Sequence, residues 1–489
     1  MDQTDNFELF DSSSSEPVPK PGQRSRQSEF GQYMTSPEIS NFMAGMFTPP
    51  ACDVVLLDAG AGQASLTTAF VQRWSNKEQR IEAHAYEIDV NMLGGLRRNM
   101  SVLASPNVDI EVVEGDFLEH AAHMIALSKG PRYTHAILNP PYGKISASSL
   151  HRKWCRVGGL ETVNLYSGFI GLSLKLMRPG GEVVAIIPRS FCNGPYYLPF
   201  RRLLLGEAAI RRIHLFGSRD RAFKEDAVLQ ENVIIHLVRG AEQGDVTIST
   251  STDRTFSDMN ESIYPFESIV FPDDNQSFIH VPSGEEGEAD LRHHATLEDI
   301  GLKVSTGPVV DFRVRPHLRQ FPEFNDAPLL YPGHFVKGNI IWPRPAFKKP
   351  NAIARNVETE RLLYPAGFYV LVKRFSSKEE KKRVVAYLIE PEKLGGYEGA
   401  IGFENHFNVF HDDRKPLDEA TARGLAIYLN GSAFDAAFRR FNGHTQVNAT
   451  DLRNMTYPDR ATIVQLGEWA RNNPSASQEE IDKAIIDIE

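Results

Sequence analysis

Short apolar segments typical of strands alternate with helix-like segments over residues 54–238 of this chain. The first of them, Val54-Val-Leu-Leu57, is an unbroken apolar run, as expected for a parallel strand buried on both faces. Alternation of this kind predicts an α/β domain with a doubly wound sheet. Ligands of such sheets bind beyond the carboxyl ends of the strands, so the residues that follow each predicted strand are the ones to inspect.

A glycine-rich turn, Asp58-Ala-Gly-Ala-Gly62, follows the first predicted strand, and a helix is predicted from Ser65. Gly60 and Gly62 allow a ligand to approach the backbone closely. The third small position is Ala64 and no Lys-Ser/Thr pair follows, which excludes a P-loop. The turn alone does not select one cofactor.

Acidic residues end the next two predicted strands, over residues 81–89 and 110–117. Glu87 stands where a carboxylate can accept hydrogen bonds from two ribose hydroxyls, although a nicotinamide enzyme would carry the same arrangement. Asp116 can receive an adenine amine, and Phe117 can lie against the adenine ring. An ordinary helix cap is the alternative interpretation of Asp116.

Asn139-Pro-Pro-Tyr142 follows the fourth predicted strand, which begins near His135. Two successive prolines have fixed φ and no backbone donor, so the chain must leave the sheet as a rigid turn. Asn139 Oδ1 and the Pro140 carbonyl can both accept hydrogen bonds from an exocyclic amine, which turns the amine lone pair out of ring conjugation. Tyr142 can stack on the ring. The alternative is an ordinary turn with a surface tyrosine.

The remainder of this half predicts one more helix and three more strands. The helix covers residues 165–177 and stops at Arg178-Pro-Gly-Gly181, and a strand follows over residues 182–188. Residues 213–217 and 232–238 predict an antiparallel pair at the edge of the sheet, with a basic loop between them. An acidic stretch rich in Ser, Asp and Gly, from residue 239 to about 298, predicts a domain boundary.

Charge is distributed unevenly along the chain. The formal net charge is −10, yet residues 301–390 hold 16 Lys and Arg against 8 Asp and Glu, and residues 201–224 are also basic. These clusters favour contact with nucleic acid, with solvated surface as the alternative. Three cysteines without zinc or disulfide spacing suit a reducing cytoplasm, and no metal site is expected. No apolar run reaches membrane-spanning length, so no membrane contact is expected.

The order of these motifs resembles that of a known enzyme family. Thr35, Asp58-x-Gly-x-Gly62, Glu87, Asp116-Phe117, Asn139-Pro-Pro-Tyr142 and then Phe223 in a basic loop resemble the γ-class DNA adenine-N6 methyltransferases. These are the TaqI-like enzymes of type II restriction–modification systems, and within them the chain is most similar to the PstI/BsuBI group. The stretches Asn164-Leu-Tyr-Ser-Gly-Phe169 and Ile186-Ile-Pro-Arg-Ser-Phe191 add to the resemblance, because neither a dehydrogenase nor a kinase requires them.

The resemblance implies a fold, a cofactor and partners. A Rossmann-like, S-adenosylmethionine-dependent methyltransferase domain would cover residues 28–290. Residues 1–27 precede it, and their Ser-, Pro- and acid-rich composition predicts a disordered tail. A mixed α+β target-recognition domain would cover residues 295–475. The implied activity is transfer of a methyl group to the N6 amine of a flipped-out adenine in duplex DNA. Double-stranded DNA is the expected partner, together with a cognate restriction endonuclease acting on the same site.

The resemblance also implies roles for individual residues. For S-adenosylmethionine, the implied binding residues are Thr35, Asp58, Gly60, Gly62, Glu87, Asp116, Phe117 and Pro141. Asn139 and Pro140 would bind the target amine, and Tyr142 and Phe223 would stack on opposite faces of the base.

Three alternatives stay open. Protein-glutamine and RNA amino-methyltransferases share Asn-Pro-Pro-Tyr, but they are usually shorter and lack a large C-terminal module. A non-enzymatic DNA-binding protein on an inactive methyltransferase fold is a second alternative, against which the intact Asn139, Tyr142 and Glu87 argue. A fused nuclease is a third, because Glu380-Lys-Lys382 matches a short nuclease-like pattern.

Overall fold

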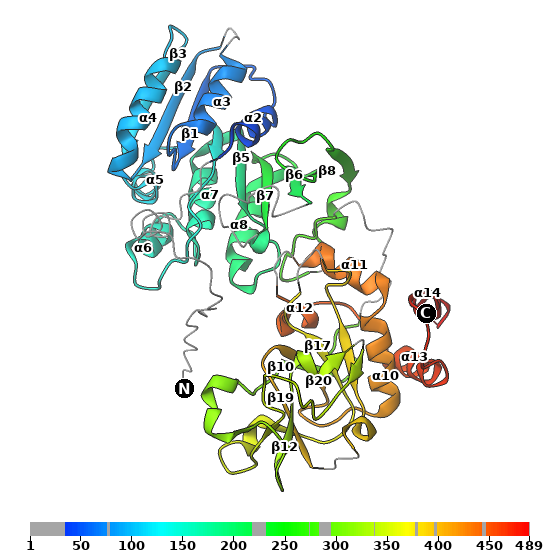
Figure 1. Ribbon diagram of the computed structural model, residues 1–489. Coiled ribbons are helices and arrows are strands. Elements are labelled where there is room, and N and C mark those ends of the chain that lie inside the picture. The colour runs from blue at the N-terminus through cyan, green and yellow to red at the C-terminus, as the bar shows by residue number, and fades with distance from the viewer. Residues whose placement is uncertain are drawn as a thin grey trace.

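The computed structural model describes residues 35–75, 79–217, 231–272, 274–282, 295–336, 338–376, 380–395, 399–442 and 446–488. Figure 1 shows two bodies, a blue-to-green one formed by the N-terminal half and a lime-to-red one formed by the C-terminal half. The predicted tail over residues 1–27 and the predicted base-stacking residue Phe223 lie outside the described residues. Among the described helices, none is long and apolar enough to cross a membrane.

A nine-stranded sheet forms the centre of the first domain, in the order β3-β2-β1-β4-β5-β7-β6-β8-β9. Strands β3, β2, β1, β4 and β5 are parallel, whereas β7 runs antiparallel to both of its neighbours. The strands are β1 (Val54–Ala59), β2 (Ile81–Glu87), β3 (Val108–Glu114), β4 (Tyr133–Leu138), β5 (Met177–Pro188), β6 (Ala208–Phe216), β7 (Asn232–Arg239), β8 (Val246–Ser251) and β9 (Asn260–Tyr264).

Helices cover both faces of this sheet, and neighbouring residues of one strand belong to opposite cores. Leu56 packs in a core with α2 and α3, and Leu57 packs in a second core with α5, α7 and α8. Both leucines are fully buried, which explains the unbroken apolar run in the sequence. The helices are α2 (Pro37–Gly45), α3 (Ser65–Trp74), α4 (Val90–Leu103), α5 (Phe117–Ala126), α6 (Leu150–Val157), α7 (Leu165–Leu176) and α8 (Leu198–Glu207).

The doubly wound α/β prediction is therefore confirmed. The chain proceeds from β1 outward to β3 on one side and then continues with β4 and β5 on the other side of β1. The strand order thus reverses between β1 and β4, and the crevice of such a sheet opens at that reversal, beyond the carboxyl ends of the two strands. The glycine-rich turn follows β1, and Asn139 follows β4, so both motifs lie at this place.

The prediction that an antiparallel pair ends the sheet is wrong, and one strand begins earlier than predicted. Strands β6 and β7 do pair antiparallel, but β7 lies inside the sheet between β5 and β6, and β8 and β9 extend the sheet beyond β6. Both additional strands come from the stretch over residues 239–298 in which the domain boundary is predicted, and both precede residue 290, the predicted end of the catalytic domain. Arg178-Pro-Gly-Gly181 also lies within β5, although α7 ends at Leu176 close to the predicted stop.

The C-terminal domain combines small sheets with a layer of helices, as the mixed α+β prediction requires. Its sheets have the orders β10-β20-β17-β18, β11-β15-β12-β19-β16 and β13-β14. The strands are β10 (Lys303–Thr306), β11 (Leu318–Arg319), β12 (Ala327–Leu330), β13 (Phe335–Val336), β14 (Asn339–Ile340), β15 (Ala352–Ile353), β16 (Leu363–Pro365), β17 (Tyr369–Lys373), β18 (Ala386–Ile389), β19 (Ala400–Phe403) and β20 (Phe407–His411). The helices are α10 (Glu419–Leu429), α11 (Ser432–Phe441), α12 (Ala449–Arg453), α13 (Arg460–Asn472) and α14 (Gln478–Ile488).

Two glycines bring α10 and α13 into very close contact. A Cβ atom added to Gly424 of α10 would lie 1.7 Å from the carbonyl oxygen of Ile463, and one added to Gly467 of α13 would lie 1.9 Å from that of Ala420. Neither position has room for a side chain, so the two backbones pack directly against each other. Figure 1 shows this pair on the outer side of the C-terminal domain.

Candidate cofactor and target-amine site

The turn after β1 lies directly against the turn after β4. The backbone N–H groups of Gly60 and Ala61 both donate to the Tyr86 carbonyl, at 3.0 and 2.9 Å. Gly60 has φ 82° and Gly62 has φ 56°, conformations that glycine adopts without strain. A Cβ atom on Gly60 would lie 3.9 Å from Pro141 Cδ and 4.0 Å from the Asn139 carbonyl oxygen. The two motifs predicted from the sequence thus form one site.

The space beside the second glycine is open. An added Cβ on Gly62 would have no heavy atom within 4 Å, so a ligand has room against the backbone at this position. Ala64, the third small residue, caps α3 with φ 76°, in the left-handed region that glycine usually occupies. The turn therefore keeps the left-handed backbone geometry despite the alanine.

Two buried carboxyl groups lie beneath this turn. Asp58 is 1% exposed; its Oδ2 accepts from Thr67 Oγ1 at 2.7 Å, and its Oδ1 has no hydrogen-bond partner. Burial, with a contribution from nearby Glu87, raises the pKa of Asp58 to about 7. The Glu87 oxygens accept from the backbone N–H groups of Gly62 and Asp89, both at 2.8 Å. An unpartnered buried carboxyl oxygen is costly, so this place suits a cationic ligand.

The next strand end carries Asp116 and Phe117. Asp116 caps α5 by accepting from the Leu118 N–H at 2.8 Å, and its other oxygen lies 3.0 Å from His151 Nε2 on α6. The helix-cap interpretation of Asp116 is therefore confirmed, and contact with an adenine amine stays a prediction. Phe117 is 3% exposed and its ring centroid lies 5.3 Å from both Tyr86 and Phe169, so it is a core residue at the border of the crevice.

Hydrogen bonds fix the orientation of the Asn139 amide. Asn139 Nδ2 donates to Thr35 Oγ1 at 2.9 Å, which joins the segment before α2 to the turn after β4. The Tyr142 hydroxyl lies 3.3 Å from Asn139 Oδ1 and 3.2 Å from the Ile186 carbonyl oxygen. The amide oxygen of Asn139 therefore faces the Tyr142 hydroxyl.

A polar cluster behind Tyr142 was not predicted from the sequence. The Tyr166 ring meets Tyr142 edge-on, with the centroids 6.3 Å apart and the planes at 81°. Ser190 Oγ lies 3.1 Å from the Tyr166 hydroxyl and 3.4 Å from that of Tyr197. Asn164 Nδ2 donates to Tyr197 at 2.6 Å. The stretches 164–169 and 186–191, already distinctive in the sequence, carry most of this cluster and were the available signal.

Comparison with known proteins gives matches along the whole chain. Residues 64–223 match the family model described as Eco57I restriction-modification methylase. The chain is 46% identical to type II methyltransferase M.BsuBI of Bacillus subtilis over 475 residues, which cover 94% of each protein. It is 42% identical to type II methyltransferase M.PstI of Providencia stuartii over 465 residues, 91% of each. The chain belongs to the type II restriction–modification methyltransferases. It is a DNA methyltransferase, and its cofactor is S-adenosylmethionine.

Solved structures share the two-domain architecture of this methyltransferase. A type IIL restriction-modification enzyme, MmeI, solved with DNA, has a TM-score of 0.52 over 92% of this chain and 71% of MmeI, at 10% identity. DrdV, also solved with DNA, has a TM-score of 0.51 over 92% of this chain and 57% of DrdV, at 12% identity. At such identities these likenesses concern the fold, and they extend over both domains.

The chemistry of the crevice fits the cofactor of this methyltransferase. S-adenosylmethionine supplies a methyl group that is already activated on a positively charged sulfur. Asp58, with one orphaned oxygen, and Glu87 are both buried beneath a turn with room for a ligand. No cluster of three or more His, Cys, Asp or Glu side chains able to hold a metal ion occurs in the described part of the methyltransferase.

One arginine of the basic cluster predicted over residues 201–224 is buried in this methyltransferase. The Arg201 side chain is fully buried and donates to the backbone carbonyls of Phe191, Gly194 and Gln276 at 2.9, 2.8 and 3.0 Å. Its guanidinium also lies 4.8 Å from the centre of the Phe278 ring. Arg201 therefore holds the chain in place, and the prediction that it forms a solvated or nucleic-acid-binding surface is wrong. Residues 218–224 of the same cluster lie outside the described residues.

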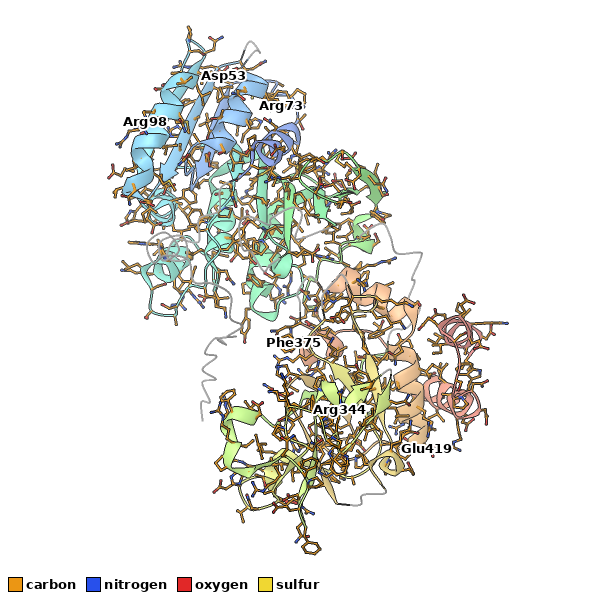
Figure 2. The ribbon with its side chains drawn as sticks, viewed as in Figure 1. Asp53, Arg73, Arg98, Arg344, Phe375 and Glu419 are labelled. Carbon is orange, nitrogen blue, oxygen red and sulfur yellow. The ribbon has the colours of Figure 1, made fainter. Side chains whose placement is uncertain are left out.

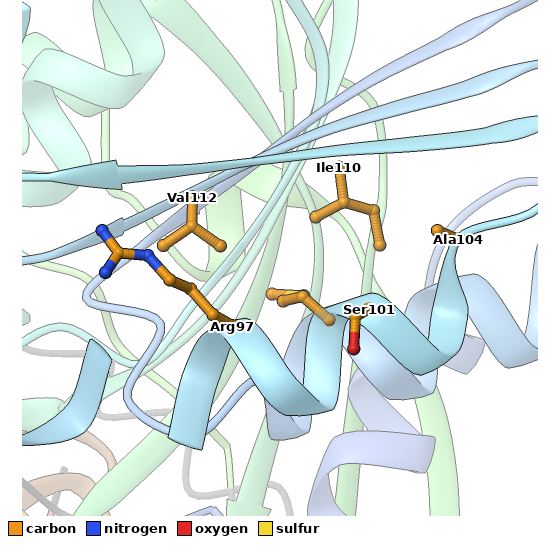
Figure 3. A pocket seen from close by; sticks show the side chains of 6 residues that line it. Arg97, Ser101, Ala104, Ile110 and Val112 are labelled. Carbon is orange, nitrogen blue, oxygen red and sulfur yellow. The ribbon is translucent and has the colours of Figure 1, made fainter. Parts of the chain in front are cut away.

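A cavity of the methyltransferase domain is separate from this crevice. It measures about 320 Å³ and lies between α4 and β3 (Figure 3), with walls formed by Arg97, Met100, Ser101, Ala104, Ile110 and Val112. Helix α4 starts three residues after the carboxyl end of β2, and the helical residues of the lining, Arg97, Met100 and Ser101, come from its C-terminal half. The cavity therefore lies away from the turns that carry Gly60 and Asn139.

Proposed function

We propose that this methyltransferase is a γ-class enzyme that methylates the N6 amine of adenine at a specific site in duplex DNA. The observation that carries the proposal is the contact between the two turns, with Asn139 and Pro141 beside Gly60. This contact puts acceptors for an amine next to the crevice for a methyl donor. The comparisons support DNA methylation, and the adenine N6 position is inferred from the chemistry of the Asn139-Pro-Pro-Tyr142 turn.

The proposed reaction needs little besides positioning. Asn139 Oδ1 and the Pro140 carbonyl would accept hydrogen bonds from the two N–H groups of the amine, which would direct the nitrogen lone pair toward the methyl group. The nitrogen–carbon bond forms as the carbon–sulfur bond breaks, and the excess proton leaves the nitrogen for solvent. In-line placement of two reactants can supply a large part of such a rate enhancement, so the proposed step does not require a strong general base.

Different residues of the crevice would contact different parts of the cofactor. Thr35 and Asp58 would face its methionine end, Glu87 its ribose hydroxyls, and Asp116 and Phe117 its adenine. Glu87 is already committed to two backbone N–H groups, and each carboxylate oxygen has further lone pairs with which to accept. Gly60, Gly62 and Pro141 would form the floor and wall of the crevice.

Cofactor affinity should depend on pH through Asp58. A carboxyl group with a pKa of about 7 is half protonated at neutral pH, and only its anionic form attracts a cation. We expect S-adenosylmethionine to bind more tightly as the pH rises from 6 to 8. Below pH 7 the affinity should rise by up to roughly tenfold per pH unit, because the anionic fraction of Asp58 rises by up to that factor. Calorimetric titration across this range would measure the dependence.

Two variants make the Asp58 prediction specific. Asp58→Asn should bind the cofactor weakly and with a flat pH profile. His151→Ala removes a different titrating group of the crevice and should leave the step near pH 7 in place. A wild-type affinity that stays constant from pH 6 to 8 would contradict the assignment of Asp58 to the cationic end of the cofactor.

The proposed substrate must leave the double helix to reach Asn139. An adenine amine is enclosed within the duplex, so the nucleotide must be flipped out at a cost of a few kcal/mol. Stacking on an aromatic ring returns about 1–3 kcal/mol per base. Two acceptors, at Asn139 and Ile186, fix the Tyr142 hydroxyl, which holds its ring ready for stacking. Phe223 stays the proposed partner on the opposite face of the base.

The C-terminal domain would read the DNA sequence. Two of its loops, residues 311–324 and 344–350, are joined by an ion pair between Lys349 and Asp311 at 2.7 Å and by a hydrogen bond from Gln320 Nε2 to the Phe347 carbonyl at 2.8 Å. These loops expose cations and aromatic rings together, and we call this surface the basic–aromatic face. Its exposed members are Phe312, Arg313, Arg315, Phe321, Phe324, Lys348 and Lys349.

Three cations of the predicted basic cluster over residues 301–390 have structural partners within the C-terminal domain. Lys373 forms an ion pair with Glu380 at 3.2 Å, and Arg374 donates to the Asn405 carbonyl at 3.3 Å. Arg344 donates to the Gly333 carbonyl and lies over the Phe347 ring. Figure 2 shows Phe375, by contrast, on the side of the C-terminal domain nearest the methyltransferase domain, and its side chain is 41% exposed. Phe375 is therefore an additional candidate for DNA contact.

The proposal extends to the setting of the enzyme. We infer that it acts in the cytoplasm and protects host DNA from a cognate restriction endonuclease that recognises the same site. RNA or protein-glutamine methylation is the alternative, but it gives no role to the second domain. The nuclease-like Glu380-Lys-Lys382 is not supported, because Lys382 is half-buried and donates to the Asn430 carbonyl and to Gln478.

Product analysis tests the proposed function. The enzyme is incubated with S-adenosylmethionine labelled on the methyl group and with genomic duplex DNA, RNA or a release-factor protein. Digestion of the DNA should yield labelled N6-methyl-2′-deoxyadenosine, and the methylated adenines should lie in one repeated sequence. In a synthetic duplex, 2-aminopurine at the target position should brighten when the enzyme binds. Label confined to cytosine, RNA or protein would refute the proposal.

A further inference from the structure

Arg189 joins the two domains from the end of β5. It opens the short 3₁₀ helix Arg189–Phe191, and its side chain is 5% exposed. Its Nη2 donates to three backbone carbonyls at 3.2, 3.1 and 2.9 Å, which belong to Val281, Arg439 and Arg440. Arg439 and Arg440 are part of the last turn of α11, about 250 residues further along the chain. One guanidinium of the methyltransferase domain thus holds a helix end of the C-terminal domain.

The place of this contact on α11 has a physical reason. The last carbonyl groups of a helix have no partner within the helix, and they carry partial negative charge. A buried cation that donates to two of these carbonyl groups supplies the missing hydrogen bonds and also offsets the negative charge. Val281 contributes a further link, because its N–H donates to the Arg440 carbonyl at 3.1 Å. Helix α11 is therefore capped from outside its own domain.

Opposite charges alternate across the junction. Arg189 Nη1 lies 3.2 Å from Glu231 Oε1, and Glu231 also acts on the buried Arg383 of the C-terminal domain, where it opposes the lowering of the pKa by burial. Asp435 of α11 accepts from the Arg383 backbone N–H at 2.6 Å and from Arg439 Nε at 2.7 Å. Removing one member of such a buried network leaves an uncompensated charge, so the network favours one arrangement of the domains.

The neighbours of Arg189 contact the residues proposed to hold the target base. Three residues before it, the Ile186 carbonyl lies 3.2 Å from the Tyr142 hydroxyl. One residue after it, Ser190 Oγ lies 3.1 Å from the hydroxyl of Tyr166, whose ring packs edge-on against Tyr142. A displacement of Arg189 would therefore move both supports of Tyr142 together.

We propose that Arg189 is a positioning residue that makes the geometry of the Asn139–Tyr142 turn depend on docking of the C-terminal domain. The proposal rests on the proposed function, because it treats Tyr142 as the support of the target base. Arg189 does not touch the substrate; it acts through Ile186 and Ser190. The domain that reads the DNA and the turn that holds the amine then share one rigid connection.

Substitution of Arg189 should slow the chemical step more than it weakens binding. Arg189→Met keeps an unbranched apolar stem and removes the guanidinium with its donors. We expect the single-turnover methylation rate to fall at least tenfold, while the dissociation constants for S-adenosylmethionine and DNA change less than threefold. Arg189→Lys, which retains the positive charge, should recover part of the rate. Ser190→Ala should lower the rate although the hydrogen bonds from Arg189 to the end of α11 remain.

Arg239→Met is the matched control. Arg239 donates to the Glu207 carbonyl at 2.8 Å and pairs with the Glu207 carboxylate, so it combines a carbonyl contact with an ion pair inside one domain. If Arg239→Met slows methylation as much as Arg189→Met, the effect of Arg189 is general destabilisation and the proposal is overturned. A wild-type single-turnover rate in both Arg189→Met and Ser190→Ala would overturn it as well. If Arg189→Met fails to fold, Arg189→Lys and Ser190→Ala decide the question.

Amide hydrogen exchange gives a second readout that needs no substrate. In Arg189→Met, peptides that cover residues 139–145 and the end of α11 should both lose protection, whereas Arg239→Met should change neither. This measurement distinguishes a failure of the proposed function from a failure of the proposed role of Arg189. Coupled loss of protection in an enzyme that does not methylate adenine would refute the proposed function and support the connection, and unchanged protection at residues 139–145 would refute the connection alone.

Discussion

Alanine at Asn139 should lower the rate of methyl transfer by roughly 10²–10³-fold or more, the usual loss when one preorganised polar group is removed from a reacting centre. The amide oxygen is the side-chain acceptor proposed for the target amine, and the Pro140 carbonyl alone cannot direct the nitrogen lone pair. Cofactor binding should change little, because Asp58 and Glu87 keep their own partners. Single-turnover methylation and calorimetric cofactor titration measure the two effects.

A matched asparagine distinguishes this loss from damage to the fold. Asn473 ends α13 and its Nδ2 donates to the Trp469 carbonyl at 2.8 Å, so Asn473→Ala also deletes an amide that contacts the backbone. We expect this variant to methylate at the wild-type rate. Turnover of Asn139→Ala within a few-fold of the wild type would show that the amine is held elsewhere, and the proposed site would then be wrong.

Removal of three cations from the basic–aromatic face should weaken DNA binding and its salt dependence together. Each phosphate contact adds about 0.9 to the slope of log affinity against log salt concentration. For Arg313→Ala, Arg315→Ala and Lys348→Ala combined, we expect a slope smaller by roughly 2.7. Between 50 and 200 mM salt the wild type should lose about 40-fold more affinity than this variant, which fluorescence anisotropy with a labelled duplex can measure.

The control for the basic–aromatic face uses three cations of α13 and α14. Figure 1 shows these helices on the outer side of the C-terminal domain, and Arg460, Arg471 and Lys483 lie on them. Alanine at all three changes the net charge by the same amount and should leave the salt slope unchanged. Equal losses in the two triple variants would mean that net charge, and not this face, governs binding.

The central parallel strands β1 and β5 could be predicted from the sequence because they are buried on both faces. Each contains an apolar run that few other structures explain, and the glycine-rich turn after β1 lies where the strand order reverses. Strands β8 and β9 have no such signal. The sequence of β9, Asn260-Glu-Ser-Ile-Tyr264, is exposed along most of its length, so it resembles the linker predicted there. The strands of the C-terminal domain, two to five residues long, are too short for a periodic pattern.

The parts of the site that could be predicted are those held by neighbouring strands. Asp58, Gly60, Glu87 and Asn139 follow strands that pair side by side, so their proximity follows from the topology. Arg189 could not be found in this way. Its partners lie 92, 250 and 251 residues away, and no local pattern distinguishes a buried interdomain arginine from an exposed one.

The glycine contact between α10 and α13 has a consequence for redesign of this enzyme. New target specificities are commonly sought by exchanging recognition segments between relatives, and the joints of such chimaeras decide whether the product folds. Gly424 and Gly467 hold two backbones together where no side chain fits, so this helix pair tolerates neither a shift in register nor a larger residue. The loops of the basic–aromatic face have no such constraint at Phe324, which is 95% exposed. A graft should therefore exchange the loops and transfer the helix pair intact, with both of its glycines from the same parent.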